Sequence, residues 1–588
     1  MRNPSFFHQV ARSVVATLVS LVVVLLIIGG GLYLALNQGS DLPDQGWLVI
    51  DLHGDIPEYD PPGSFPTSLM SGDALTLQSI LDALGKAAVD DRVEGVIWRL
   101  SAGNNAGWAK LEEMRQATQL VKDAGKPVIA WADVMSLRTM YLAAACDSIF
   151  MPRGGYFDFK GFLSQTMHVK GTLDKLGIEP HVSKIREYKA AAEMVMETGM
   201  TEPVREQRQH ILDDLWETVA STVADERGLT RERLDELLGF GALEPLAAAE
   251  AGVIDAVRYW QEMEAELVAQ MDDDDLKLLP VITPADYREI PWSDLRDEGD
   301  LTVAVVHAQG TIGGRENNVN PLLGIMMGHE SVVRELQRAR LDDDVDAIVF
   351  RVDSGGGDGL TSDLIGHEID LCAQAKPTVV SMVDVAASGG YQISFRATRL
   401  MADPMSIVGS IGSISAFFDM SGFYEKIGVS KDSVEAGPMA SLGRDDRAPT
   451  AAEWEAFQLS HYAGFNDWLQ QVADRRGLTF AQMEERAYGR IFGGREALEL
   501  NLIDGLGNLQ DAVALAAELV ESEDTDQPQV VHLPEPVGML DDILGNGPGR
   551  GDPVTMALRW RLYTGLRQEA RLTQQLLTTE AVLDPVPR

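Results

Sequence analysis

The chain has 588 residues, of which 45% are hydrophobic and 24% charged, a globular composition in a chain too long for one core. Lys and Arg number 49 against 90 Asp and Glu, giving a formal charge of −41, and such a surface argues against nucleic acid as a partner. The two cysteines, Cys146 and Cys372, lie in apolar or helical contexts and indicate buried thiols, neither a disulfide framework nor a metal cluster. No cofactor is indicated.

The N-terminus predicts a membrane anchor. No charged residue occurs from Ser13 to Ser40, and residues 13–37 are long enough to cross a bilayer as a helix. Arg2 and Arg12 precede this segment while acidic residues follow it, which places residues 1–12 in the cytoplasm and the rest of the chain outside. The length favours a retained signal anchor over a cleaved signal peptide, although the glycines at 29–31 leave cleavage open.

An internal repeat with a period near 250 residues divides the remaining chain into two halves. Five segment pairs recur in the same order: residues 47–56 and 304–312, 90–99 and 342–351, 124–133 and 374–384, 174–178 and 425–429, and 251–255 and 500–504. Short apolar strands alternate with helical stretches such as 331–340 and 361–375, which predicts an α/β fold with a mainly parallel sheet in each half. Helical periodicity over 451–476 predicts that each half ends in a helical subdomain.

These patterns define the predicted domains. The first repeat covers residues 46–270, an acidic and proline-spaced linker covers 271–299, and the second repeat covers 300–523. A tail at 524–588 contains an amphipathic helix over 556–577, which could lie on a membrane or pack on protein.

The second half contains a candidate nucleophile. An apolar run at 378–383 reads as a buried strand, and Ala387-Ser388-Gly389-Gly390 follows it, which predicts a tight strand-to-helix turn. A serine placed there can present its Oγ and the following N–H groups to an acyl substrate. By itself the pattern more often marks a helix N-cap than a nucleophile. The first half has Leu137 in this position, so only the second half has kept a hydroxyl there.

A glycine-rich loop at 351–359 lies between a strand and a helix, where free N–H groups can face an anion. This signal is weak alone, and no Gly-Lys-Ser/Thr follows, so a P-loop is excluded.

A serine nucleophile needs a base. The second half offers four histidines, none in a triad context: His307, His329, His367 and His461. The alternative is a buried lysine with a lowered pKa, and Lys189 of the first half, next to three alanines, suits that role. Met439 or Ala440 replaces it in the second half, so each half holds one of the two groups.

The chain resembles the S49 serine peptidases, in particular their long tandem-repeat form, signal peptide peptidase A or protease IV. The resemblance runs from the anchor to about residue 520 and is carried by these segments: 188–191 (Tyr-Lys-Ala-Ala), 351–357, 387–391 (Ala-Ser-Gly-Gly-Tyr), 409–412 (Gly-Ser-Ile-Gly) and 503–504 (Ile-Asp). One departure is Gly355, where the family commonly has proline in Ser-Pro-Gly-Gly.

The resemblance implies two tandem domains of the crotonase/Clp-protease type and a homo-oligomer in the bacterial inner membrane with its catalytic domains on the periplasmic side. It implies Ser388 as nucleophile, Lys189 as general base, and an oxyanion hole formed by the N–H groups of Gly356 or Gly357 and of Gly389. The implied substrates are cleaved signal peptides and other extended apolar peptides.

Two other functions remain open from the sequence. A crotonase-like acyl-CoA enzyme would use the same oxyanion geometry without a covalent serine, although an anchor that sends the chain outward separates it from cytoplasmic coenzyme A. A catalytically silent membrane scaffold is the second alternative.

Overall fold

The computed structural model describes residues 42–59, 75–101, 103–158, 160–239, 243–271, 275–288, 290–320, 323–520 and 527–534. The predicted anchor at 13–37 and the predicted helix at 556–577 lie outside these residues. Within the described part, no helix combines the length and apolar character needed to cross a membrane.

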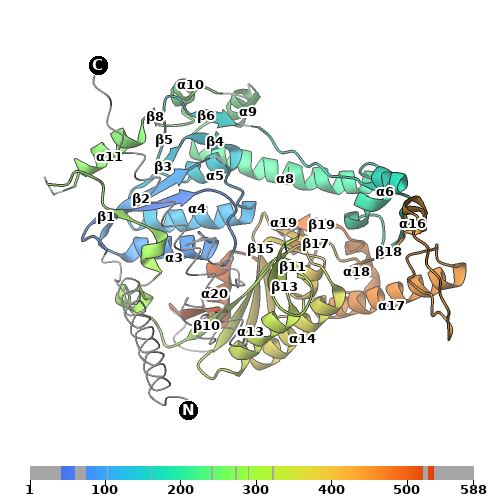
Figure 1. Ribbon diagram of the computed structural model, residues 1–588. Coiled ribbons are helices and arrows are strands. Elements are labelled where there is room, and N and C mark those ends of the chain that lie inside the picture. Colours follow the sequence, from blue (N-terminus) through green and yellow to red (C-terminus); the bar gives the residue numbers. More distant parts are fainter. Residues whose placement is uncertain are drawn as a thin grey trace, which may run out of the picture.

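Each half is built on a mainly parallel sheet, as the repeat predicts (Figure 1). The first sheet is parallel throughout, in the order β8 (Ala256–Val257), β5 (Ser148–Met151), β3 (Val128–Ala132), β2 (Val93–Leu100), β1 (Gly46–Leu52) and β9 (Val281–Ile282). The second runs β19 (Ile491–Gly493), β17 (Ile407–Gly409), β15 (Thr378–Ala387), β14 (Ala347–Ser354), β10 (Thr302–Gln309) and β21 (Gln529–Leu533), with β16 (Arg399–Ala402) also paired to β15 and β20 (Gly505–Leu506) paired to β16. In the second sheet β19 is antiparallel to β17.

Helices cover both sheets. Those of the first half are α3 (Leu77–Val89), α4 (Trp108–Asp123), α5 (Leu137–Ala144), α6 (Lys170–Leu176), α7 (Glu193–Met196), α8 (Glu202–Glu226), α9 (Arg231–Gly239), α10 (Pro245–Glu250), α11 (Trp260–Val268) and α12 (Pro284–Tyr287). Those of the second half are α13 (His329–Leu341), α14 (Gly359–Ala375), α15 (Gly389–Gln392), α16 (Ser421–Ile427), α17 (Ala451–Arg476), α18 (Phe480–Arg486), α19 (Gly494–Glu499) and α20 (Leu509–Glu518). The predicted helices at 331–340, 361–375 and 451–476 correspond to α13, α14 and α17.

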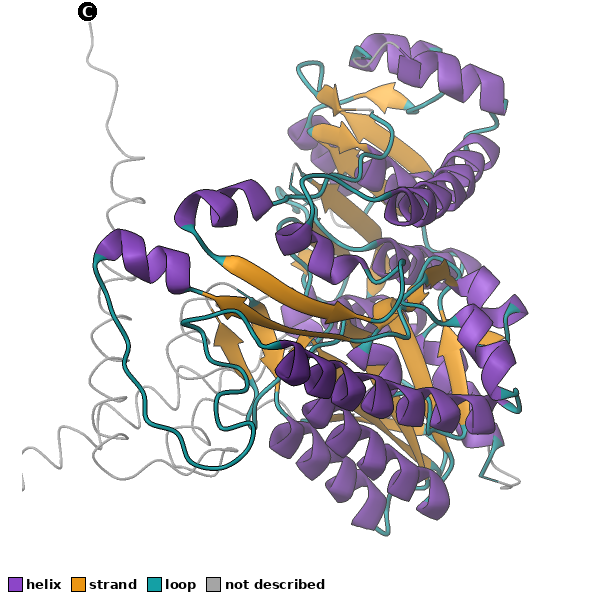
Figure 2. Ribbon diagram, turned by 90° about the vertical axis from the view of Figure 1, so that its right-hand side faces the viewer, coloured by secondary structure: helices purple, strands orange, loops and turns teal. Residues whose placement is uncertain are grey.

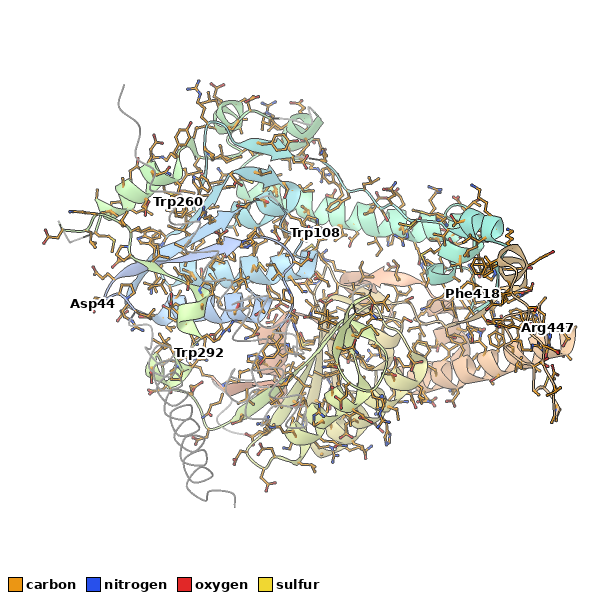
Figure 3. The ribbon with its side chains drawn as sticks, viewed as in Figure 1. Asp44, Trp108, Trp260, Trp292, Phe418 and Arg447 are labelled. Atoms are coloured by element: carbon orange, nitrogen blue, oxygen red, sulfur yellow. The ribbon has the colours of Figure 1, made fainter. Side chains whose placement is uncertain are left out.

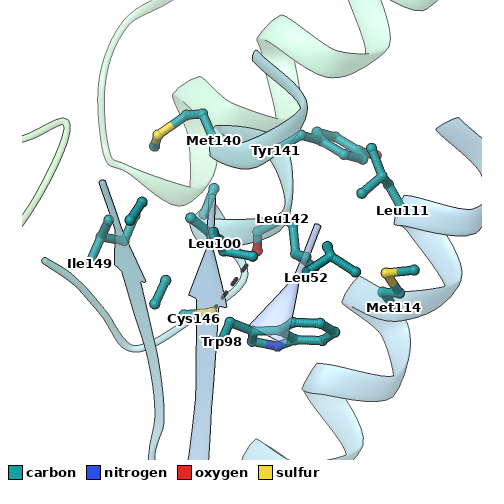
Figure 4. Close-up of a cluster of buried hydrophobic side chains, with 14 of the residues drawn as sticks. Leu52, Trp98, Leu100, Leu111, Met114, Met140, Tyr141, Leu142, Cys146 and Ile149 are labelled. Carbon is teal, nitrogen blue, oxygen red and sulfur yellow. Dashed lines mark hydrogen bonds between the residues drawn. The ribbon is translucent and has the colours of Figure 1, made fainter. Parts of the chain in front are cut away.

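Alternation along the strands places a core on each face of a sheet. In the first half, Trp98 and Leu100 of β2 pack with Leu111 of α4 and Tyr141 of α5 (Figure 4). The opposite face carries a smaller cluster with α11. Both cysteines are buried and free, as predicted, and burial raises the pKa of the Cys372 thiol to about 12.

The segments predicted as linker and tail contribute to the sheets. Part of the linker forms β9, which pairs with β1, and the start of the tail forms β21, which pairs with β10. The sequence does not predict these short edge strands, because two to five residues are too few to show a clear periodicity.

The halves are joined at one end by a two-stranded ribbon. There β7 (Glu179–Lys184) of the first half pairs antiparallel with β18 (Ile414–Asp419) of the second. In Figure 1 the long helices α8 and α17 extend toward this ribbon from their own sheets, and Figure 2 shows the ribbon from the side. Short strands complete the fold: β4 (Val134–Ser136) with β6 (Tyr156–Asp158), and β11 (Thr311–Ile312) with β13 (Gly324–Met327) and β12 (Asn318–Asn320).

Candidate active site

Ser388 lies at the turn between β15 and α15, as the run of small residues predicts. Its backbone has a φ of 56° and a ψ of −118°, a conformation rarely adopted by residues other than glycine. The Ser388 N–H donates to the Gly409 carbonyl at 2.8 Å, and the Ser388 carbonyl accepts from Gln392. The turn therefore holds the side chain at the end of the strand.

The equivalent turn of the first half is an ordinary capped helix. Ser136 accepts a hydrogen bond from the Thr139 N–H at the start of α5, and Leu137 is buried in the core. No hydroxyl stands at the position of Ser388, in agreement with the comparison of the two repeats.

Lys189 reaches Ser388 from the other half. Its side chain belongs to the segment that leaves the β7–β18 ribbon, and its Nζ lies 2.8 Å from the Ser388 Oγ. The same Nζ lies 2.9 Å from the Ser410 carbonyl oxygen and 3.0 Å from the Ser410 Oγ. The structure thus brings together two side chains that are 199 residues apart.

Burial controls the charge of this lysine. Lys189 is 4% exposed, and desolvation lowers its pKa from 10.5 to about 7. The backbone fits closely around it, because a Cβ on Gly489 would collide with the Lys189 backbone and Cβ. Gln207 of α8 holds the segment in place by donating to the Tyr188 carbonyl at 2.9 Å and accepting from the Ile491 N–H at 3.2 Å.

Ser410 is a further site residue, and the sequence alone predicts no role for it. It lies in the Gly-Ser-Ile-Gly segment at 409–412, with a φ of 50°. A neutral amine has two N–H donors and one lone pair. If both donors bind the two oxygens of Ser410, the lone pair faces the Ser388 hydroxyl. Near the repeat equivalent of Ser410, the first half has Phe159-Lys160, without a hydroxyl group. A comparison of the two halves could therefore point to Ser410.

The glycine-rich loop lies beside the serine turn. The Gly356 N–H donates to the Ser354 Oγ at 3.1 Å. No acceptor for the N–H of Gly357 or of Gly389 occurs among the described residues. These two groups are neighbours, since a Cβ on Gly389 would lie 3.0 Å from the Gly357 nitrogen. Two free donors therefore converge next to Ser388, whereas Gly356 is already engaged.

None of the four candidate histidines is a hydrogen-bond partner of Ser388 or Lys189 in the described residues. His307 contacts His532 at 3.0 Å, and His461 contacts Ser413 and Ser183. Away from Ser388, one group of described residues could offer three ligand atoms to a metal ion: Glu179, His181 and Asp419 of the β7–β18 ribbon, with these atoms within 4.8 Å of one another.

Two segments of the chain match the model of peptidase family S49, residues 121–273 and 371–523. Together they span more than half of its length, so the chain belongs to the S49 serine peptidases and carries two S49 domains in tandem. The resemblance seen in the sequence is thereby confirmed, and membership favours peptide hydrolysis over acyl-CoA chemistry.

Among known proteins, the chain is similar to the chloroplastic serine protease SPPA of Arabidopsis thaliana, with 31% identity over 80% of this chain and 69% of that protein. It is 30% identical to protease 4 of Salmonella typhi over 84% of this chain and 82% of that one. A solved structure, a mutant of the 1510-N membrane-bound stomatin-specific protease in complex with a substrate peptide, has 15% identity over 42% of this chain and 96% of that chain. The TM-score of that comparison is 0.26.

Proposed function

We propose that this peptidase hydrolyses peptide bonds with a dyad formed by Ser388 and Lys189. The observation that carries the proposal is the 2.8 Å contact between the Lys189 Nζ and the Ser388 Oγ. A lysine with a pKa of about 7 is substantially neutral near pH 7 and can therefore act as a general base.

The reaction proceeds through an acyl-enzyme. Neutral Lys189 takes the Ser388 hydroxyl proton while the Oγ attacks the peptide carbonyl, and the N–H groups of Gly357 and Gly389 donate to the resulting oxyanion. Protonated Lys189 then gives its proton to the leaving amine as the C–N bond breaks. Water attacks the acyl-enzyme with Lys189 again as base, which releases the carboxylic acid and restores Ser388.

The proposed substrates are extended apolar peptides, above all signal peptides left in the membrane after cleavage. The uncharged segment at 13–37 supports an anchor in the inner membrane with both S49 domains on its outer side. That arrangement places the dyad where such peptides are released.

The proposed assembly is a homo-oligomer, and the repeat indicates how copies would meet. The partners in the β7–β18 ribbon have repeat equivalents in residues 430–435 and 163–168, and neither of these segments pairs with a strand in the described residues. Both expose apolar side chains, among them Val434 and Leu163. Pairing 430–435 of one copy with 163–168 of the next would repeat the ribbon between chains. Sedimentation of a detergent-solubilised chain as a monomer would argue against it.

Labelling with a fluorophosphonate probe tests the dyad. The wild type should react at one serine, and Ser388→Ala and Lys189→Ala should both lose labelling. Lys184→Ala is a matched control, because Lys184 lies on β7 and pairs with Glu193 at 3.4 Å, away from Ser388. Full labelling of Lys189→Ala would refute the dyad, and an unreactive wild type would support the silent scaffold.

A further inference from the structure

A buried lysine of the first half reaches into the second half near the serine turn. Lys110 lies in the first turn of α4, and it is 6% exposed. Its Nζ lies 2.8 Å from the Asp353 Oδ2 and 3.6 Å from the Asp384 Oδ2, and it donates to the Ile56 carbonyl at 3.2 Å. Figure 3 labels Trp108, the first residue of α4, where the two halves meet.

The two carboxylates precede the two parts of the candidate active site. Asp353 is followed by Ser354 and the glycine-rich loop, and Asp384 lies four residues before Ser388. Lys110 therefore links the strand end that carries the loop N–H groups to the strand end that carries the serine.

Backbone pairing is interrupted at this point. The register of β14 and β15 is regular up to Val352 opposite Met382, and it resumes only at Ser354 opposite Ala386. One residue of β14 thus faces three of β15, so ladder hydrogen bonds do not fix the spacing of the strand ends there. Side chains bridge the interruption: the Asp353 Oδ1 accepts the Val385 N–H at 3.3 Å, and Lys110 contacts both Asp353 and Asp384.

The N-terminus of α4 also binds the Asp384 carboxylate. The Ala109 N–H donates to the Asp384 Oδ1 at 3.0 Å and the Lys110 N–H at 3.4 Å, where the helix dipole favours a negative charge. The approach requires glycine at the preceding residue, because a Cβ on Gly107 would overlap the Asp384 carboxyl group. Burial lowers the pKa of Lys110, but Asp353, Glu58 and Asp384 together outweigh this effect, so the pKa is raised and the lysine is charged.

We infer that Lys110 is a positioning residue for the Ser388 reaction, because it sets the spacing between the glycine-rich loop and the serine turn across a break in the strand pairing. This role rests on the proposed function of Ser388. Lys110 also gives the first half a second part in the site, in addition to Lys189. It lies on α4, which is the repeat equivalent of α14, the helix that follows the glycine-rich loop of the second half.

The test compares Lys110→Met with Lys86→Met in hydrolysis of a fluorogenic apolar peptide by the full-length protein. Lys86 is a matched control: it is 3% exposed, pairs with Asp82 at 2.7 Å and donates to the Tyr287 carbonyl at 2.9 Å, all within the first half. Lys110→Met should lower kcat by up to about 10²-fold with KM little changed, because the strand ends lose their alignment. Lys86→Met should keep kcat. Lys110→Arg should restore part of the loss, since its charge can still bridge the two acids.

A second pair of variants decides the question if Lys110→Met does not fold. Gly107→Ala has an unstrained backbone, with a φ of −67°, and the atoms nearest to its new Cβ belong to the Asp384 carboxyl group, so it should lower kcat. Gly171→Ala in α6, where a Cβ would meet no atom within 4 Å, should leave kcat unchanged. A kcat in Lys110→Met equal to that of Lys86→Met, or a normal kcat in Gly107→Ala, would overturn the inference. Activity retained in Ser388→Ala would instead overturn the proposed function, so the two failures are distinguishable.

Discussion

The buried lysine makes a quantitative prediction about stability. A pKa of about 7 in the folded protein, against 10.5 for an ordinary lysine, means that the folded state binds fewer protons than the unfolded state between these pH values. Stability therefore rises with pH across this window. At 1.36 kcal/mol for each pH unit, the charged side chain destabilises the fold by about 5 kcal/mol below pH 7, and this cost disappears above about pH 10.5.

Replacing Lys189 by methionine isolates that contribution, because methionine keeps most of the side-chain volume and carries no charge. The variant should be more stable than the wild type near neutral pH. Its advantage should shrink by about 2 to 3 kcal/mol between pH 7.5 and 9.5, because folding of the wild type releases a proton from this lysine in that window. Urea unfolding of both proteins at the two pH values measures the difference.

Subtracting the variant from the wild type removes the contributions of all other titrating groups, provided that they do not contact Lys189. Desolvation is the sole cause of the lowered pKa, so no acidic neighbour complicates the subtraction. A stability difference that is the same at pH 7.5 and 9.5 would show that Lys189 titrates normally, and the argument for a neutral base would fail.

The same contacts support predictions about pH dependence, catalysis and stability. The kcat/KM of the wild type should rise as the pH is raised through about 7, because the base must be neutral; a profile that is flat from pH 6 to 8 would contradict this. Ser410→Ala should lower kcat about tenfold, since Lys189 loses a hydrogen bond of about 1 to 1.5 kcal/mol that orients it, and steady-state kinetics measures this. Arg351→Met should destabilise the protein by about 3 to 5 kcal/mol, because it leaves the buried carboxylates of Glu58 and Glu113 unpaired; a change in unfolding free energy below about 1 kcal/mol would show that these acids are neutral in the fold.

Much of the fold was predictable because the repeat supplies an internal comparison. Strands with long apolar runs and helices with clear periodicity were located from the sequence, and the pairing of Ser388 with Lys189 was inferred because each half lacks what the other keeps. The resemblance to the S49 peptidases supplied the roles. The sequence does not predict the role of Ser410, because a serine in a Gly-Ser-Ile-Gly segment does not reveal which atom it contacts.

The contacts between the halves could not be predicted. Arg99 and Arg351 end equivalent strands, yet Arg99 is half exposed beside Asp51 whereas Arg351 is 0% exposed. The difference depends on Glu58 and Glu113 of the first half, which bind Arg351 at 2.7 Å. Nothing in the periodicity of either segment shows which copy will be covered by the other, because periodicity reports only packing within one element.

Dividing the site between two halves makes the activity dependent on their docking. Lys189 has no charged group that lowers its pKa, and its neutrality comes from dehydration alone. If the halves were separated, water would reach its Nζ, its pKa would return toward 10.5, and it would be protonated at neutral pH. The cost of about 5 kcal/mol for burying it must be offset by the rest of the interface. The buried pairs of Arg351 with Glu58 and Glu113 lock the halves together, since breaking one would leave a charge without a partner. The base is therefore created by the same contact that completes the site.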